Sequence, residues 1–130
     1  MTTPRLLLVD DNADNLEVLA VLLGEMYTVV SCGSAAEALR AVETDEPDLL
    51  VLDIGMAPID GVQCLQAIRA RPGYARIPAI ALTAFARDVE RNAFLEAGFQ
   101  AVVTKPILDH RAFLAAIEGL LEWPALRSAS

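Results

Sequence analysis

Asp53 is the residue whose position first suggests chemistry. It ends a run of four aliphatic residues, Leu49 to Leu52, and is followed by Ile54 and Gly55. An aliphatic run of this length between turn residues is typical of a strand buried on both faces of a parallel sheet. Open α/β sheets bind ligands at the carboxyl ends of such strands. We therefore interpret Asp53 as a reactive carboxylate, although an aspartate here also suits capping of the following turn.

Four further polar residues end apolar runs in the same way. Asp10 and Asp11 follow the first run of the chain, Thr83 follows the fourth, and Lys105 lies just beyond the fifth. Taken one at a time, each is explained by capping or by a solvated loop. At one sheet edge, however, the carboxylates of Asp10, Asp11 and Asp53 would repel one another unless a cation lay between them. Oxygen ligands without nitrogen or sulfur favour Mg²⁺.

The same group of side chains is suited to accept a phosphoryl group. We expect Mg²⁺ to be held by the three carboxylates and by the backbone carbonyl of Gly55, with coordination positions left for phosphoryl oxygens. Lys105 and the Thr83 hydroxyl would then neutralise or bind the remaining oxygens. In this interpretation Asp53 is the nucleophile, and the product is an aspartyl phosphate.

Strand-like and helix-like segments alternate along the whole chain. Apolar runs predict strands at residues 5–9, 27–32, 49–53, 77–82 and 99–103. Helical spacing of apolar residues and capping signals predict helices that follow each strand, at about residues 12–24, 34–43, 61–70, 88–97 and 109–122. The fourth of these helices is expected to bury Val89, Ala93 and Phe94, and Gly98 is well placed to end it.

This alternation predicts an α/β fold, a doubly wound five-stranded parallel sheet with helices on both faces. The chain has 130 residues, which matches one domain. We expect the domain to span residues 1–124 and the last residues, 125–130, to form a C-terminal tail.

Composition narrows the functional classes. A formal net charge of -8 gives no basic surface for nucleic acid, so direct binding to DNA or RNA is not expected. No signal peptide and no apolar run long enough to cross a bilayer are recognised, so we expect a cytoplasmic protein that binds no membrane. Cys32 and Cys64 belong to no metal-binding or redox motif and are expected to be buried.

Taken together, these residues resemble the response-regulator receiver domain of bacterial two-component signalling. The resemblance covers nearly the whole chain, in the family's order and spacing. The matching positions are Asp10-Asp11, Asp53, Asp60-Gly61, Thr83-Ala84 and Lys105-Pro106.

The resemblance implies a flavodoxin-like sheet of strand order 2-1-3-4-5. It also implies that Asp53 accepts a phosphoryl group from a phosphohistidine on a sensor histidine kinase or a histidine phosphotransfer protein. By the same resemblance, Asp10, Asp11, Asp53 and the Gly55 carbonyl hold Mg²⁺, while Lys105 and Thr83 contact the phosphoryl group. Phosphorylation then changes binding of a downstream protein at the face formed by the fourth helix, the fifth strand and the fifth helix.

Two positions depart from the family pattern. The proline that usually follows the phosphoacceptor by four residues is one place later here, at Pro58. The aromatic residue that usually rotates inward on activation is replaced by Val102, three residues before the lysine. Because valine has no ring, we expect a weaker response or one that uses other apolar groups, with Phe85, Ile107 and Leu108 as candidates.

Two other functions are weighed against a phosphorylated interaction domain. A phosphatase acting on external substrates would be expected to carry a second acid two residues after the nucleophile, where this chain has Gly55. A degenerate receiver that binds partners without phosphorylation is disfavoured by the intact acids, Thr83 and Lys105. The sequence also leaves open whether the chain acts alone or is the receiver domain of a hybrid histidine kinase.

Overall fold

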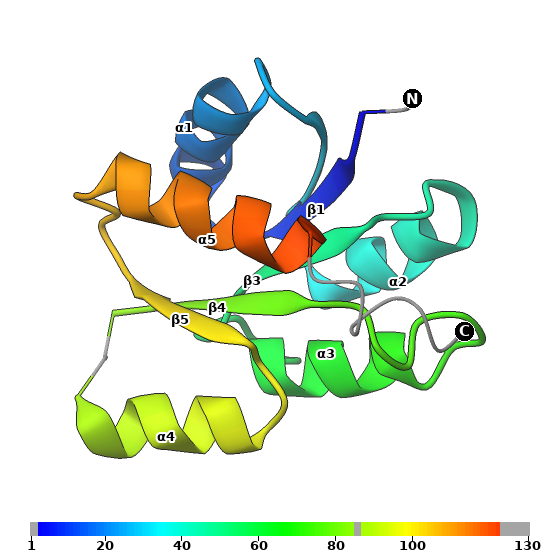
Figure 1. Ribbon diagram of the computed structural model, residues 1–130. Helices are drawn as coiled ribbons and strands as arrows, with labels where there is room; N and C mark the ends of the chain where they lie inside the picture. The colour runs from blue at the N-terminus through cyan, green and yellow to red at the C-terminus, as the bar shows by residue number, and fades with distance from the viewer. Residues whose placement is uncertain (1–2, 85–86, 123–130) are drawn as a thin grey trace.

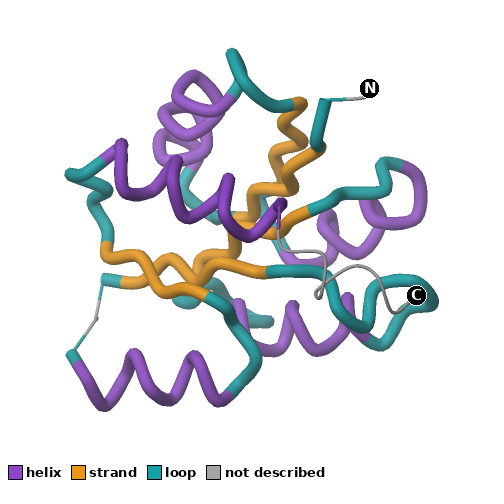
Figure 2. Tube along the Cα trace, in the orientation of Figure 1, coloured by secondary structure: helices purple, strands orange, loops and turns teal. Residues whose placement is uncertain are grey.

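The computed structural model describes residues 3–84 and 87–122, which form alternating strands and helices (Figures 1 and 2). The strands are β1 (Arg5–Val9), β2 (Thr28–Cys32), β3 (Leu49–Asp53), β4 (Ala79–Thr83) and β5 (Ala101–Thr104). The helices are α1 (Ala13–Leu23), α2 (Ala35–Thr44), α3 (Gly61–Arg69), α4 (Asp88–Glu96) and α5 (His110–Glu122). The predictions for Phe85 and for the tail at 125–130 lie outside the described residues.

All five strands pair in parallel in the order β2-β1-β3-β4-β5. Helices α1 and α5 cover one face of this sheet, and α2, α3 and α4 lie on the other (Figure 1). The fold class and the strand order inferred from the sequence are therefore confirmed. None of the described helices has the length and apolar character needed to cross a membrane.

Two hydrophobic layers hold the sheet, and the alternation of side chains along each strand assigns residues to them. In β1, Leu6 and Leu8 pack toward α1 and α5, whereas Leu7 and Val9 pack toward α2 and α3. Strands β1 and β3 each contain four leucine or valine residues that are at most 1% exposed. Burial on both faces explains why their sequences read as unbroken aliphatic runs.

Four helices begin where the sequence places a capping residue. The side chains of Asn12, Ser34, Asp60 and Asp109 accept hydrogen bonds from backbone amides in the first turns of α1, α2, α3 and α5. Gly61 follows the Asp60 cap, and a Cβ atom there would lie 2.5 Å from the carbonyl oxygen of Asp53. Glycine thus lets the start of α3 approach the end of β3 closely.

Helix α4 differs from the prediction, because Val89 and Ala93 are not buried. Val89 is 80% exposed, and no residue of the helix is fully buried. Only Phe94 packs partly against the core layer of α2 and α3. The helix lies beside the edge strand β5, at one side of the sheet (Figure 1).

The C-terminal end of α4 is tied to its neighbours by Arg69, the last residue of α3. Its guanidinium group donates hydrogen bonds to the carbonyl oxygens of Gly98 and Ile77 and to the side chain of Gln100, at 2.7, 2.8 and 3.2 Å. Gly98 has a φ of 114°, and a Cβ atom there would lie 2.5 Å from Arg69 Nη1. Glycine is therefore required at the position where the sequence predicted the end of α4.

Cys32 and Cys64 are both buried, as predicted, and burial raises the pKa of each thiol to about 11. We expect neither thiol to react with an alkylating reagent at pH 8 in the folded protein, since the reactive thiolate is scarce and shielded. Intact mass after timed alkylation measures this, with urea-unfolded protein as the control that reacts fully. The pKa of each thiol is higher in the folded protein than the value of about 8.5 in an unfolded chain. The protonated thiols therefore contribute to folding stability in full below about pH 8.5, and this contribution is lost as pH rises through about 11. Rapid labelling of the folded protein at pH 8 would contradict the prediction.

Candidate functional site

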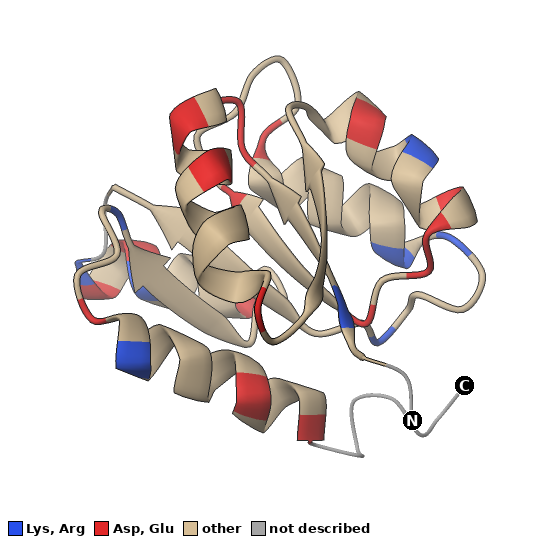
Figure 3. Ribbon diagram, turned by 90° about the horizontal axis from the view of Figure 1, so that it is seen from above, with Lys and Arg blue, Asp and Glu red and all other residues tan. Residues whose placement is uncertain are grey.

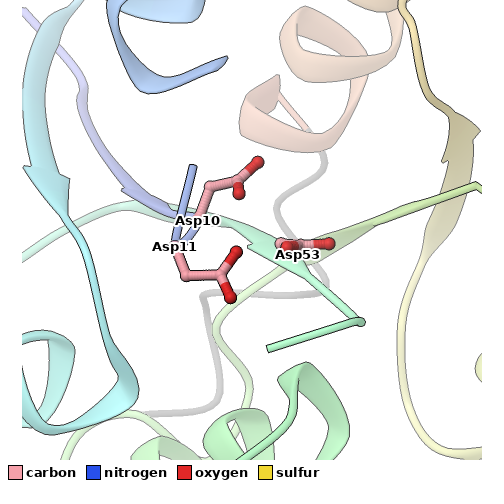
Figure 4. A group of neighbouring side chains, drawn as sticks. All are labelled: Asp10, Asp11 and Asp53. Atoms are coloured by element: carbon pink, nitrogen blue, oxygen red, sulfur yellow. The ribbon is translucent and has the colours of Figure 1, made fainter. Parts of the chain in front are cut away.

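Three carboxylates meet at the carboxyl edge of the sheet. Asp53 is the last residue of β3, while Asp10 and Asp11 follow the neighbouring strand β1 (Figure 4). One carboxylate oxygen from each residue lies within 4.8 Å of the others. Asp10 and Asp53 are 1% and 4% exposed, and Asp11 is exposed. The structure therefore brings together the three acids that the sequence analysis placed at one edge of the sheet.

Asp53 is held by one charged and one neutral hydrogen bond. Its Oδ1 atom accepts from Lys105 Nζ at 3.0 Å and from the backbone amide of Gly55 at 3.2 Å. The backbone amide of Gly55 belongs to the turn that directly follows β3, so its hydrogen bond lets the turn help to hold the carboxylate at the end of the strand. Burial with these two donors keeps this carboxylate oriented toward the other acids rather than toward open solvent.

Asp10 is the most deeply buried acid of the site. It accepts hydrogen bonds from the backbone amide of Asn12 at 2.9 Å and from Asn15 Nδ2 at 3.3 Å. Lys105 Nζ lies 3.6 Å from its Oδ2 atom. Burial is the main reason that the pKa of the Asp10 carboxyl is raised above 3.8; the charge of Asp53 raises it further, against the Asn12 amide and Lys105, which lower it.

Lys105 reaches the acids from the loop after β5. Its backbone amide donates to the carbonyl oxygen of Thr83 at 2.8 Å, which ties this loop to the end of β4. Burial alone lowers the pKa of the ammonium group, but the hydrogen bond to Asp53 and the charges of Asp10 and Asp53 outweigh it and raise that pKa above 10.5. The lysine therefore remains charged and bridges two buried carboxylates.

A cleft of about 440 Å³ opens above these groups. Thr83, which is 4% exposed, lies on its wall with Ala84 and Gly55. Every site residue predicted from the sequence therefore lines one cleft: Asp10, Asp11, Asp53, Gly55, Thr83 and Lys105.

The apolar residues considered for the conformational response are arranged differently. Val102 is buried in β5 at 6% exposure, so it belongs to the core layer on the α2 and α3 face. Ile107 is half-buried beside α5, and Leu108 is 87% exposed. None of these three lines the cleft above Asp53.

Two polar residues of the cleft were not predicted. Asn15, in the first turn of α1, donates to Asp10, and its place three residues after the Asn12 cap could have suggested it. Glu90, in the first turn of α4, also lines the cleft. No sequence signal marks Glu90, because an acid in a first helical turn is ordinary.

The donor set fits a hard divalent cation. Three carboxylates offer oxygen ligands within reach of one another. The described residues that line the cleft include no histidine and no cysteine, the usual nitrogen and sulfur ligands of metal ions. Asp and Glu outnumber Lys and Arg in the chain, whose formal net charge is -8 (Figure 3). Such an arrangement suits Mg²⁺ better than Zn²⁺.

Comparison with known proteins identifies the family. The family model described as "Response regulator receiver domain" matches residues 6–118. An uncharacterized 14.6 kDa protein in the sodA1 3′ region of Leptolyngbya boryana is 39% identical over 103 residues, which are 78% of this chain and 79% of that protein. The sensor histidine kinase GacS of Pseudomonas protegens is 38% identical over 128 residues, covering 95% of this chain but 13% of the kinase.

Solved structures agree with this assignment. The receiver domain of the sensor histidine kinase PA1611 from Pseudomonas aeruginosa, described with a magnesium ion coordinated in its active-site cleft, has a TM-score of 0.81 and 28% identity, and the match covers 92% of this chain and 98% of that one. The chemotaxis protein CheY4 of Vibrio cholerae, at 20% identity and a TM-score of 0.84, supports the fold. The aspartate cleft, the strand order and these matches together place the chain in the response-regulator receiver family, as a domain homologous to those of response regulators and hybrid sensor kinases.

Proposed function

We propose that Asp53 is the phosphoacceptor of this receiver domain and that Asp10, Asp11, Asp53 and the Gly55 carbonyl hold the Mg²⁺ ion that the reaction requires. The observation that carries the proposal is the convergence of three carboxylates around one lysine, with Lys105 Nζ 3.0 Å from Asp53 Oδ1. Two of these carboxylates, Asp10 and Asp53, are buried, and buried carboxylates cost stability unless a cation or ligand pairs with them.

The proposed reaction is a phosphoryl transfer between two protein side chains. An Asp53 carboxylate oxygen forms a bond to phosphorus, while the bond between phosphorus and the imidazole nitrogen of the phosphohistidine breaks, and the imidazole departs with its electron pair. Lys105, held in place through Asp10, then pairs with a phosphoryl oxygen, and the Thr83 hydroxyl binds another. Mg²⁺ bound by the carboxylates supplies positive charge that offsets the phosphoryl oxygens and the acids.

The donor we propose is a sensor histidine kinase or a histidine phosphotransfer protein. The chain spans only 13% of GacS and 27% of the transcriptional regulatory protein GlrR of Escherichia coli. We further propose that residues 1–124 form the receiver domain, that it functions in the cytoplasm without binding nucleic acid or membrane, and that the output surface is the face of α4, β5 and α5. Leu95 in α4 and Leu108 between β5 and α5 are exposed apolar residues, which supports this choice of output surface.

The phosphoacceptor role is tested by intact mass after incubation with a small-molecule phosphodonor, with Mg²⁺ and with a chelator. We expect one phosphoryl adduct that depends on Mg²⁺ and is lost in Asp53→Asn. Asp48→Asn is a matched control, because Asp48 lies at the opposite end of β3 and its replacement removes the same charge. Bound Mg²⁺ without any adduct would instead favour the degenerate receiver, a domain that binds partners without phosphorylation, for which Val102 is the observation in favour.

A further inference from the structure

Glu90 adds a fourth carboxylate to the cleft that Asp10, Asp11 and Asp53 line. Its Oε1 atom accepts hydrogen bonds from Arg87 Nη2 at 2.8 Å and Nε at 3.0 Å. Its Oε2 atom is buried, and no described residue donates a hydrogen bond to it. Glu90 thus presents a carboxylate with one partnered and one unpartnered oxygen to the cleft that contains Asp53.

The helix terminus alone does not account for this arrangement. An acid in the first turn of a helix interacts favourably with the helix dipole and needs no burial to do so. A buried oxygen without a donor carries a desolvation cost, and Lys105, which also lines the cleft, pairs with Asp53 and Asp10. The hydrogen bond from Arg87 lowers the pKa of Glu90, so the group is charged at neutral pH.

The first turn of α4 is weakly attached to the rest of the domain. Arg87 occupies the N-cap position without a side-chain capping bond, and the first turn contributes no buried residue. One contact that does cross from the helix to the sheet is a hydrogen bond from Arg91 Nη1 to the carbonyl oxygen of Val102 at 3.1 Å. Motion of this turn therefore costs little buried area and acts directly on β5.

We propose that Glu90 senses the phosphoryl group by charge: phosphorylation of Asp53 repels the Glu90 carboxylate, displaces the first turn of α4 and breaks the hydrogen bond between Arg91 and Val102. This inference rests on the proposed function of Asp53. Phosphorylation turns a singly charged carboxylate into an aspartyl phosphate with up to two negative charges, and added negative charge repels an acidic group that lines the same cleft. A response of this kind needs no aromatic ring at position 102, where this chain has valine.

The proposal makes a reciprocal prediction about binding. If an anion on Asp53 displaces Glu90, then Glu90 must weaken the binding of that anion by the same free energy. Glu90→Gln keeps the size of the side chain and removes its charge. With Mg²⁺ present, this variant should bind beryllium trifluoride, a stable mimic of the phosphoryl group, about fivefold more tightly than the unsubstituted protein in calorimetry.

The conformational part is tested by hydrogen–deuterium exchange of residues 87–96 before and after phosphorylation, with intact mass confirming equal phosphorylation. We expect faster exchange on phosphorylation in the unsubstituted protein, no such change in Glu90→Gln, and restoration in Glu90→Asp, which keeps the charge. Glu96→Gln is the control, since it removes the same charge from the exposed end of the same helix.

The outcomes separate this inference from the proposed function. If Asp53 is phosphorylated but the exchange of α4 is unchanged, or changes equally in Glu90→Gln, the charge-sensing role is wrong and the phosphoacceptor role stands. If beryllium trifluoride binds Glu90→Gln and the unsubstituted protein equally, the repulsion is also refuted. If no phosphoryl adduct forms while Mg²⁺ binds, both the proposed function and the inference fall.

Discussion

Asp10→Asn is expected to stabilise the metal-free protein against unfolding and, at the same time, to abolish Mg²⁺ binding. In the folded protein, burial and the charge of Asp53 raise the pKa of Asp10, so its ionisation at neutral pH opposes folding. Removing the charge relieves this opposition, so we expect the free energy of unfolding of the metal-free protein to rise. The same substitution removes one of three carboxylates that converge within 4.8 Å, and we expect Mg²⁺ affinity to fall by about 100-fold.

The pH dependence of this effect gives its sign an independent check. A carboxyl group with a raised folded-state pKa contributes stability below its unfolded value and loses that contribution as pH rises through the folded value. The gain in Asp10→Asn should therefore be present at neutral pH and disappear in acid. Urea unfolding with a chelator at several pH values measures the change in the free energy of unfolding, and calorimetric titration measures the affinity for Mg²⁺. Asp14→Asn, an exposed acid of α1, is the control. If Asp10→Asn were less stable than the unsubstituted protein at neutral pH, the conclusion that the Asp10 charge opposes folding would be wrong.

Lys105→Met is expected to have the opposite effect in both measurements. Without the ammonium group, which lies 3.0 Å from Asp53 and 3.6 Å from Asp10, both buried carboxylates lose their cation. Because the lysine is partly exposed, we expect the metal-free protein to lose about 1–3 kcal/mol of stability, less than for a fully buried pair. Methionine retains an apolar stem of similar length, so lost packing contributes little.

Mg²⁺ should bind Lys105→Met and restore most of the lost stability, since a divalent cation replaces the missing charge among the acids. Phosphorylation should then proceed slowly, and binding of the downstream partner should respond weakly to it. Urea unfolding with and without Mg²⁺ and timed intact-mass measurements test these points. Lys105 is the only lysine in the chain, so amine-selective acylation with and without Mg²⁺ reports on this side chain alone besides the N-terminus. Unchanged stability, phosphorylation and partner binding would contradict the role of Lys105.

The strands and the acids were predictable because both follow from simple local rules. Leu49 to Leu52 can be buried on two faces only in the centre of a sheet, and such a strand carries Asp53 to the edge where Asp10 also arrives. The strand order was predicted from the family resemblance and not from the residues. Strand β4 begins two residues later than expected, at Ala79, although Ile77 and Pro78 before it belong to the same apolar run.

The errors concern helix α4, where packing rather than pattern decides. Val89 and Ala93 follow the helical spacing of a buried face, yet both are exposed on a helix that lies beside the edge strand β5. Glu90 was overlooked for the related reason that its sequence context is that of any first helical turn. Its importance depends on where the turn is held relative to Asp53, which is a property of the tertiary structure.

The hydrogen bonds of Arg69 determine what kind of motion α4 can make. They hold Gly98 and Gln100 at one end of the helix, while the other end has no capping side chain. We therefore expect α4 to tilt about Gly98, with its N-terminal end moving most. At about 1.5 Å per residue, Arg87 lies about 16 Å from Gly98, so a tilt of about 10° moves the far end by about 3 Å. Displacement should grow steadily from Glu96 toward Arg87, and a partner that reads the far end gains the most from it.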